Sequence, residues 1–204
     1  HNSILVRYSN DFSIWDLESV NHYKDQTDIF FTCHEFSYNK IAEAYEPYLG
    51  LIRQMFHKYC SGTLEEFMEE CDVYKLQRPV FESYFEKGFC ERTEQILIDE
   101  VEYEQERMRN SIVTMLQKLS EIRPVVIVLN RFQLASKSTM QLSNSLLQVK
   151  NKNIGIVLGV NDVQSIPEFA HEEWDAICES MDDRNMVCLL YTSPSPRDGL
   201  LSRM

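Results

Sequence analysis

The sequence predicts an α/β fold in which helices cover a parallel β-sheet. Two short apolar runs rich in Val, Ile and Leu lie at 124–129 and 154–160, each bounded by polar residues or proline. Such runs are typical of strands buried on both faces, as in a parallel sheet between helices. Segments with apolar residues at helical spacing separate the predicted strands. This alternation favours right-handed crossover connections and a parallel sheet.

The first third of the chain supplies two further strands. Residues 4–8 and 28–33 are rich in β-branched and aromatic side chains, which favours strands. A capped helix that ends near Val20 is expected between them. A long amphipathic helix is expected over 38–59. Pro47 lies inside this helix and should kink it or start it anew.

Residues of about 61–122 are predicted to form an all-helical insertion between strands two and three. Thr63 and Glu66 have the spacing of a capping box, so a helix should begin there. A second helix is expected over 79–87, and the longest one over 93–120. Charged side chains on the outer face of the longest helix are most simply solvated pairs.

Two helices complete the predicted domain, which is assigned to residues 1–187. One lies between the two apolar strands, over 138–147. The other begins at Pro167 and ends near Met181. Both have the apolar spacing that buries one face of a helix against a sheet.

Residues 188–204 are predicted to be a non-native tail. The segment from Cys188 to Asp198 has no periodicity and resembles the translation of a sequencing adapter, so the biological chain is expected to stop near Val187. A genuine Pro/Ser linker is the alternative. The chain also starts at His1 without a Met and enters a strand almost at once, which indicates a fragment whose start lies upstream.

The amino-acid composition limits the kinds of partner that the chain is expected to bind. The net charge is −12 and no basic patch is visible, which argues against direct nucleic-acid binding. No run is long enough to span a membrane. The 6 cysteines form no C-x-x-C pair and no zinc-like cluster, so free thiols in a reducing cytoplasm are expected.

The apolar strand at 124–129 is followed by residues that match a known motif. The matching residues after it are Phe132, Gln133, Ala135, Ser138 and Thr139. This segment resembles the Walker B region of the STAND signalling class of P-loop ATPases, a branch related to the AAA+ proteins. The second apolar strand, with Asn161-Asp162 at its tip, looks like the sensor strand of that family, and Tyr45–Tyr48 looks like its aromatic-x-Pro-aromatic helix. The resemblance covers nearly all of residues 4–181 and implies a P-loop NTPase-like fold.

The chain departs from the family at both catalytic motifs. Asn130 and Arg131 stand where the family has two acidic residues, of which one helps to hold magnesium and one polarises the attacking water. The phosphate loop should occupy residues 9–15, which contain no Gly and no Lys. The resemblance therefore implies a degenerate nucleotide site with no catalytic residue and no metal ligand. Asn130, Arg131 and Asn161 are its vestigial positions.

Each of these polar residues also has a simpler structural interpretation. Asn130 is expected to cap a turn, and Arg131 to pair with Asp162 at the tip of the neighbouring strand. His34 and Glu35 are expected to form a hydrogen-bonded loop pair, because no nucleophile accompanies them.

Three functions follow as hypotheses. The first is a regulatory or scaffolding NTPase-like domain of a multidomain bacterial signalling protein without efficient ATP hydrolysis. Its partners would be proteins or covalently linked output domains outside the fragment, or further copies of the chain, and no cofactor is expected. The second is an ATPase that uses ATP and magnesium and whose phosphate loop lies upstream. The third is an α/β protein-interaction module whose helical insertion, 63–120, carries the interface.

Overall fold

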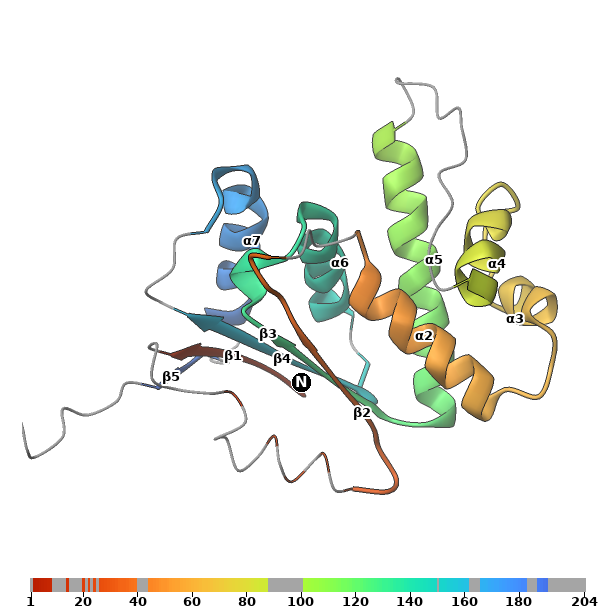
Figure 1. Ribbon diagram of the computed structural model, residues 1–204, viewed down its shortest axis with the longest axis horizontal. Coiled ribbons are helices and arrows are strands. Elements are labelled where there is room, and N and C mark those ends of the chain that lie inside the picture. Colours follow the sequence, from red (N-terminus) through yellow and green to blue (C-terminus); the bar gives the residue numbers. More distant parts are fainter. Residues whose placement is uncertain are drawn as a thin grey trace, which may run out of the picture.

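A computed structural model describes residues 2–8, 14, 20, 22, 24, 26–39, 44–87, 101–149, 151–161, 166–182 and 187–190. Its centre is a five-stranded parallel sheet with the strand order β2-β3-β4-β1-β5 (Figure 1). The strands are β1 (Asn2–Tyr8), β2 (Phe30–Glu35), β3 (Val125–Asn130), β4 (Ile154–Asn161) and β5 (Val187–Leu190). The predicted α/β class with a parallel sheet is confirmed.

The two apolar runs form neighbouring strands inside the sheet. Every residue of β3 and β4 is buried, as their unbroken apolar sequences predict. β2 lies at an edge, and most of its residues are only partly buried. It begins two residues later than the predicted strand 28–33, at Phe30. The most apolar segments therefore take the positions that are covered on both faces.

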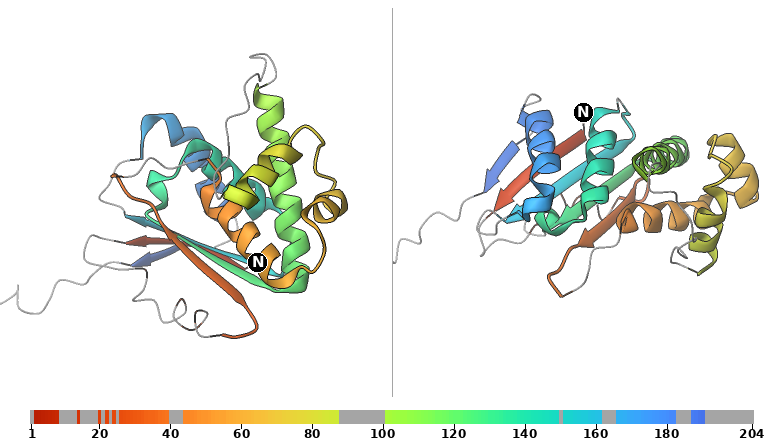
Figure 2. Two further views of the ribbon diagram at one scale, coloured as in Figure 1. Left: turned by 45° about the vertical axis from the view of Figure 1, so that its right-hand side comes forward. Right: turned by 90° about the horizontal axis from the view of Figure 1, so that it is seen from above.

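Four helices lie over one face of the sheet (Figures 1 and 2). They are α2 (Glu46–Tyr59), α5 (Val101–Ile122), α6 (Lys137–Gln148) and α7 (His171–Asp182). Their apolar sides and the strand residues that face them form the main core, which includes Leu5, Tyr48, Ile52, Ile112, Leu116, Ile127, Leu146, Leu158 and Ile177. Residues 88–100, which contain the predicted start of the longest helix, are not among those described.

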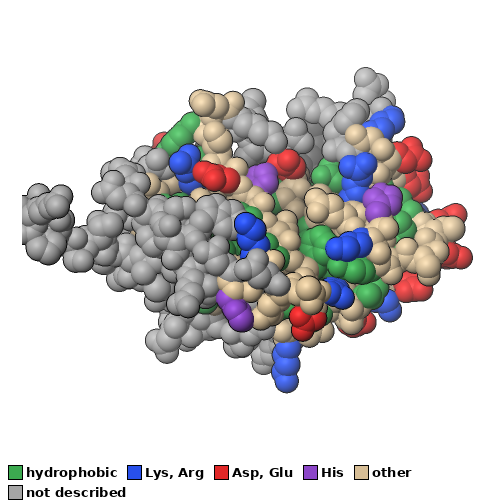
Figure 3. Space-filling model, turned by 60° about the horizontal axis from the view of Figure 1, so that its bottom comes forward, with side chains coloured by type: hydrophobic (Ala, Val, Ile, Leu, Met, Phe, Trp, Pro, Cys, Tyr) green, Lys and Arg blue, Asp and Glu red, His purple; other side chains and the backbone are tan. Residues whose placement is uncertain are grey.

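Two short helices belong to the region between β2 and β3. They are α3 (Leu64–Glu70) and α4 (Arg78–Lys87), and they lie beside α2 and α5 at one end of the molecule (Figure 1). Figure 3 shows acidic side chains gathered at this end. The exposed carboxylates of these helices are Glu65, Glu66, Glu69, Glu70, Glu82 and Glu86. Like charges at this density keep the surface solvated.

A second, smaller core lies on the opposite face of the sheet. Val6 and Tyr8 of β1 and Val126 and Val128 of β3 pack there with Ile14 and Val20, which are both buried. The connection from β1 to β2 crosses the sheet in the direction opposite to the other connections. Right-handed crossovers therefore send this connection to the second face. The helix predicted to end near Val20 lies mostly outside the described residues.

Helix starts follow the predicted signals. The capping box is present, because Thr63 Oγ1 accepts a hydrogen bond from the Glu66 amide at 3.2 Å and the Glu66 carboxylate accepts one from the Thr63 amide at 2.8 Å. Pro47 occupies the first turn of α2, so it starts the helix and does not kink it. The prediction of a helix from residue 38 is therefore wrong at its start, since residues 38–39 and 44–45 are turns. The residue before the helix, Tyr45, is left-handed with φ 61°.

The last part of the chain differs from the expected order. A short 3₁₀ helix at Glu168–Ala170 follows Pro167 and precedes α7. Val187–Leu190 pairs in parallel with β1 and forms a fifth strand. This corrects the predicted order of four strands, in which residues 188–190 belong to the tail. The origin of residues 188–204 stays a prediction.

Candidate functional site at the carboxyl edge of the sheet

The carboxyl ends of β1 to β4 carry polar side chains at one edge of the sheet. The last residues of these strands are Tyr8, Glu35, Asn130 and Asn161. Tyr8 lies opposite Asn161 in the register of β1 and β4, and Glu35 lies opposite Asn130 in the register of β2 and β3. In open parallel sheets, this edge is the usual place for a ligand. It is therefore the first candidate site.

Asn130 is held by two hydrogen bonds at the end of β3. Its side-chain Oδ1 accepts from the Tyr8 hydroxyl at 2.6 Å and from the Arg131 amide at 3.0 Å. The side chain is buried, with 6% of the residue exposed. Asn130 therefore bonds to the backbone where the chain leaves β3, and its amide oxygen has both acceptor positions in use.

Gly159 makes the bond between Tyr8 and Asn130 geometrically feasible. β4 lies between the strands that carry these two residues, so their side chains meet across it. A Cβ at Gly159 would lie 2.8 Å from Asn130 Oδ1 and 2.6 Å from Ile14 Cδ1. A glycine inside a strand often marks such a close approach. Burial raises the pKa of the Tyr8 hydroxyl, which keeps it a neutral donor.

Arg131 turns the chain out of β3 with a left-handed backbone at φ 53° and ψ 43°. Its guanidinium Nε lies 3.4 Å from Glu35 Oε1, and both side chains are nearly half exposed, at 44% and 49%. The expected partner, Asp162, lies outside the described residues. The structure supplies Glu35 of β2 as the partner, because β2 and β3 end side by side.

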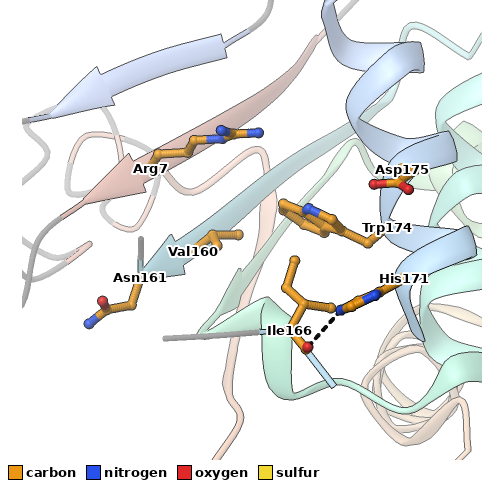
Figure 4. A pocket seen from close by; sticks show the side chains of 7 residues that line it. All are labelled: Arg7, Val160, Asn161, Ile166, His171, Trp174 and Asp175. Atoms are coloured by element: carbon orange, nitrogen blue, oxygen red, sulfur yellow. Dashed lines mark hydrogen bonds between the residues drawn. The ribbon is translucent and has the colours of Figure 1, made fainter. Parts of the chain in front are cut away.

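Asn161 ends β4 and is buried, with 6% of the residue exposed. Its backbone amide donates to Gln133 Oε1 at 3.4 Å. Gln133 is fully buried in the short 3₁₀ helix at Phe132–Leu134, which follows β3. This glutamine therefore ties the ends of the two central strands together. The side-chain amide of Asn161 points away from α7 (Figure 4).

A cavity of about 370 Å³ opens beside the end of β4. Its walls come from β1, β4 and α7 (Figure 4). The apolar lining consists of Val160, Ile166 and Trp174, and the polar lining consists of Arg7, Asn161, His171 and Asp175. His171 Nε2 lies 2.9 Å from the Ile166 carbonyl oxygen, which fixes the imidazole at the rim.

The described side chains do not assemble a catalytic centre of a familiar kind. His34 lies 3.7 Å from Glu46 of α2, whereas Glu35 pairs with Arg131, so the expected His34–Glu35 pair is replaced by two separate contacts. No group of three or more His, Cys, Asp or Glu among the described residues could hold a metal ion. Cys33, Cys60, Cys71 and Cys178 are free thiols, as predicted. Burial raises the pKa of Cys33 to about 11 and that of Cys71 to about 12, which disfavours the reactive thiolate.

The sequence placed Asn130, Arg131 and Asn161 at this edge, and the structure brings all three to the ends of adjacent strands. It missed Tyr8 and the cavity residue Arg7, which lie on the first strand and carry no motif. Gly159 was a detectable signal, because a glycine within an otherwise apolar strand indicates a close backbone or side-chain approach.

No protein-family model, curated protein or solved structure matches the chain. The fold and the geometry of the carboxyl edge therefore carry the functional argument. Within the described residues, no helix is long and apolar enough to cross a membrane.

Proposed function

We propose that the chain is a regulatory or scaffolding NTPase-like domain of the STAND class, without efficient ATP hydrolysis, within a multidomain bacterial signalling protein. The observation that carries the proposal is the state of the β3 tip. The amide oxygen of Asn130 accepts bonds from Tyr8 and Arg131, and a cation, Arg131, stands next to it. A working site needs carboxylates there to hold magnesium and to position the attacking water.

The order of the central strands also supports the proposal. β4, the sensor-like strand, lies between β1 and the Walker B-like strand β3. A polar residue at the tip of β4 is thereby adjacent to both positions where the resemblance expects nucleotide contacts. This order supports the proposal of a nucleotide-site layout whose catalytic residues have been replaced.

The strand order of the sheet does not favour the competing hypothesis of an upstream phosphate loop. β1 is paired with β4 on one side and with β5 on the other. A further parallel strand from upstream would have to join at β2 or β5, at an outer edge of the sheet. A phosphate loop there would lie away from the ends of β3 and β4, where the resemblance expects the phosphates. No cofactor is therefore part of the proposal, and ATP with magnesium belongs to this alternative.

A regulatory domain acts through partners, which we place among proteins or linked output domains in the cytoplasm. The acidic surface of α3 and α4 favours a protein partner with basic side chains over a nucleic acid (Figure 3). Self-association is a further mode for such a domain. Sedimentation of the chain across a range of concentrations, with and without ATP, would measure it.

The decisive test is ATP binding and turnover with magnesium. We expect no magnesium-dependent ATP binding in calorimetry and no phosphate release above the buffer rate. The double variant Asn130→Asp with Arg131→Glu restores both acidic residues, yet it should remain inactive because 9–15 contain no Gly and no Lys. Turnover by the unmodified chain that stops when magnesium is chelated would overturn the proposal.

A further inference from the structure

The cavity between β1, β4 and α7 lies on the helix-covered face of the sheet and is separate from the Tyr8–Asn130 bond on the opposite face. Its volume of about 370 Å³ falls within the range of small-molecule sites. Three apolar and four polar or charged residues line it, so the lining is more polar than that of most small-molecule pockets and suits a polar ligand. Asn161 is the one residue that this cavity shares with the positions of the predicted nucleotide site, and the rest of its lining lies outside those motifs.

Arg7 is the unusual residue of this cavity. It lies on a central strand and is partly buried. Its Nη2 donates to Cys178 Sγ at 3.4 Å, and its Nε is buried without a hydrogen-bond partner among the described residues. Sulfur is a weak acceptor. Arg7 is only partly buried, so its guanidinium is not fully desolvated, and an oxyanion in the cavity would be a stronger acceptor for it than the sulfur.

We propose that this cavity binds a small molecule that carries one carboxylate or phosphate group on an apolar body. Arg7 is the anion-binding residue, and its planar guanidinium suits an oxyanion with two hydrogen bonds. Val160, Ile166 and Trp174 pack against the body of the ligand. In Figure 4 the side chain of Arg7 reaches from β1 toward α7, where Trp174 and Asp175 stand.

Asp175 limits the charge of the ligand. It is exposed on α7 at the rim of the cavity and forms no ion pair with Arg7 in the described structure. Arg7 attracts every negative charge on a ligand and Asp175 repels every one, so the two side chains together add no net charge to the cavity. A polyphosphate therefore gains no net attraction from its extra charges, whereas a ligand with one anionic group can bind directly to Arg7.

The test uses three small probes: benzoate, uncharged benzamide and inorganic phosphate. The chain has 2 tryptophans, so the background variant Trp15→Phe leaves Trp174 as the only indole and its emission as the readout. We expect saturable binding of benzoate and none, or binding at least about tenfold weaker, of benzamide. A response to phosphate without benzoate would assign the site to free phosphate, and a stronger response to benzoate would assign it to a carboxylate with an apolar body.

Variants of Arg7 and Asp175 distinguish a loss of ligand binding from a loss of folding. Arg7→Gln should weaken benzoate about tenfold or more, and Asp175→Asn should tighten it by about two- to fivefold. Lys118→Gln in α5, which removes the same charge from an exposed pair with Glu70, should leave binding unchanged. Arg7→Lys keeps the charge without the planar fork and is the fallback if Arg7→Gln does not fold, with weaker binding expected.

Either of two results would overturn the proposal. The first is equal binding of benzoate and benzamide, which would show that Arg7 does not recognise the anion. The second is no response to any probe together with a lower unfolding midpoint in Arg7→Gln, which would show that Arg7 is paired with a carboxylate of its own chain.

Discussion

β3 and β4 lie side by side, run in the same direction and both end in asparagine, yet the two ends are used differently. At the end of β3, Asn130 accepts two hydrogen bonds and Arg131 pairs with Glu35. At the end of β4, the backbone of Asn161 is tied to Gln133, and a cavity with the cation Arg7 opens beside it. The partners that surround a strand end, more than the residue that terminates it, decide whether a ligand can use it.

The end of β3 is closed by the hydrogen bond between Tyr8 of β1 and Asn130 of β3, which passes over β4. Closure depends on Gly159, because any side chain there would separate Tyr8 from Asn130. The β4 end is bridged to the 3₁₀ helix after β3 through the bond from the Asn161 amide to Gln133, and the cavity opens beside it. The Tyr8–Asn130 bond thus holds the sheet on one face, whereas the proposed ligand cavity lies on the other.

The largest expected effect comes from Gly159→Ala. The added Cβ would stand 2.6 Å from Ile14 Cδ1 and 2.8 Å from Asn130 Oδ1, so the second core must shift and the bond to Tyr8 must lengthen. We expect a loss of about 3 kcal/mol in the free energy of unfolding, from overpacking together with the weakened bond. Urea denaturation followed by circular dichroism would measure it.

Gly50→Ala is the matched control for that substitution. Gly50 lies in α2 with only Tyr84 Oη near, at 3.6 Å from the added Cβ, so alanine should be tolerated and should stabilise the helix by up to about 1 kcal/mol. Similar losses for both variants would mean that Gly159 has no special role at the β3 end.

A smaller effect is expected when the closing bond is removed without a clash. Asn130→Ala removes the acceptor of the Tyr8 hydroxyl and should cost about 2 kcal/mol, whereas Tyr8→Phe should cost about 1 kcal/mol. A double-mutant cycle should show coupling between the two sites, because their side chains are in contact. Strict additivity would contradict the proposed closure of this strand end.

The same bond predicts a dependence on alkaline pH. Burial raises the pKa of Tyr8 above its usual value of 10.0, so the neutral hydroxyl stabilises the fold below that pH and the contribution is lost as the pH rises through the folded pKa. Cys33, with a folded pKa of about 11, adds a loss that begins near pH 9. Tyr8→Phe should therefore lose less stability than the unmodified chain as the pH rises above 10, whereas the Cys33 contribution is common to both proteins. An equal loss of stability with rising pH in both proteins would show that Tyr8 does not cause the pH dependence.

The sequence predicted most of the fold because its signals are local. The apolar runs of β3 and β4, the capping box at Thr63 and the helix start at Pro47 depend on neighbouring residues, and each appears where expected. The helix ends are close to those predicted, but α2 begins at Glu46, eight residues after the predicted start, because Pro47 begins the helix anew. The fifth strand was missed because Cys188–Leu190 had been assigned to a tail of foreign origin.

The partners at the candidate site were harder to predict, because they come from strands far apart in the chain. Asn130 and Tyr8 are separated by 122 residues, and Arg131 pairs with Glu35 across the edge of the sheet. Asp162 was the predicted partner of Arg131, because it follows the apolar strand that neighbours β3 in the predicted sheet. The strand order also places β2 beside β3, and that order sets the partner that the structure shows.

The smallest expected effect belongs to the Arg131–Glu35 ion pair, which separates two explanations of the closed β3 end. Both side chains are nearly half exposed and their charged atoms lie 3.4 Å apart, so solvent screens the attraction. Glu35→Gln should cost less than about 0.5 kcal/mol, and the loss should disappear at high salt. Arg131→Gln should give the same result, since it retains the backbone amide that donates to Asn130. A loss above about 1 kcal/mol that persists at high salt would show that the ion pair, and not the buried bond from Tyr8, holds the end of β3 closed.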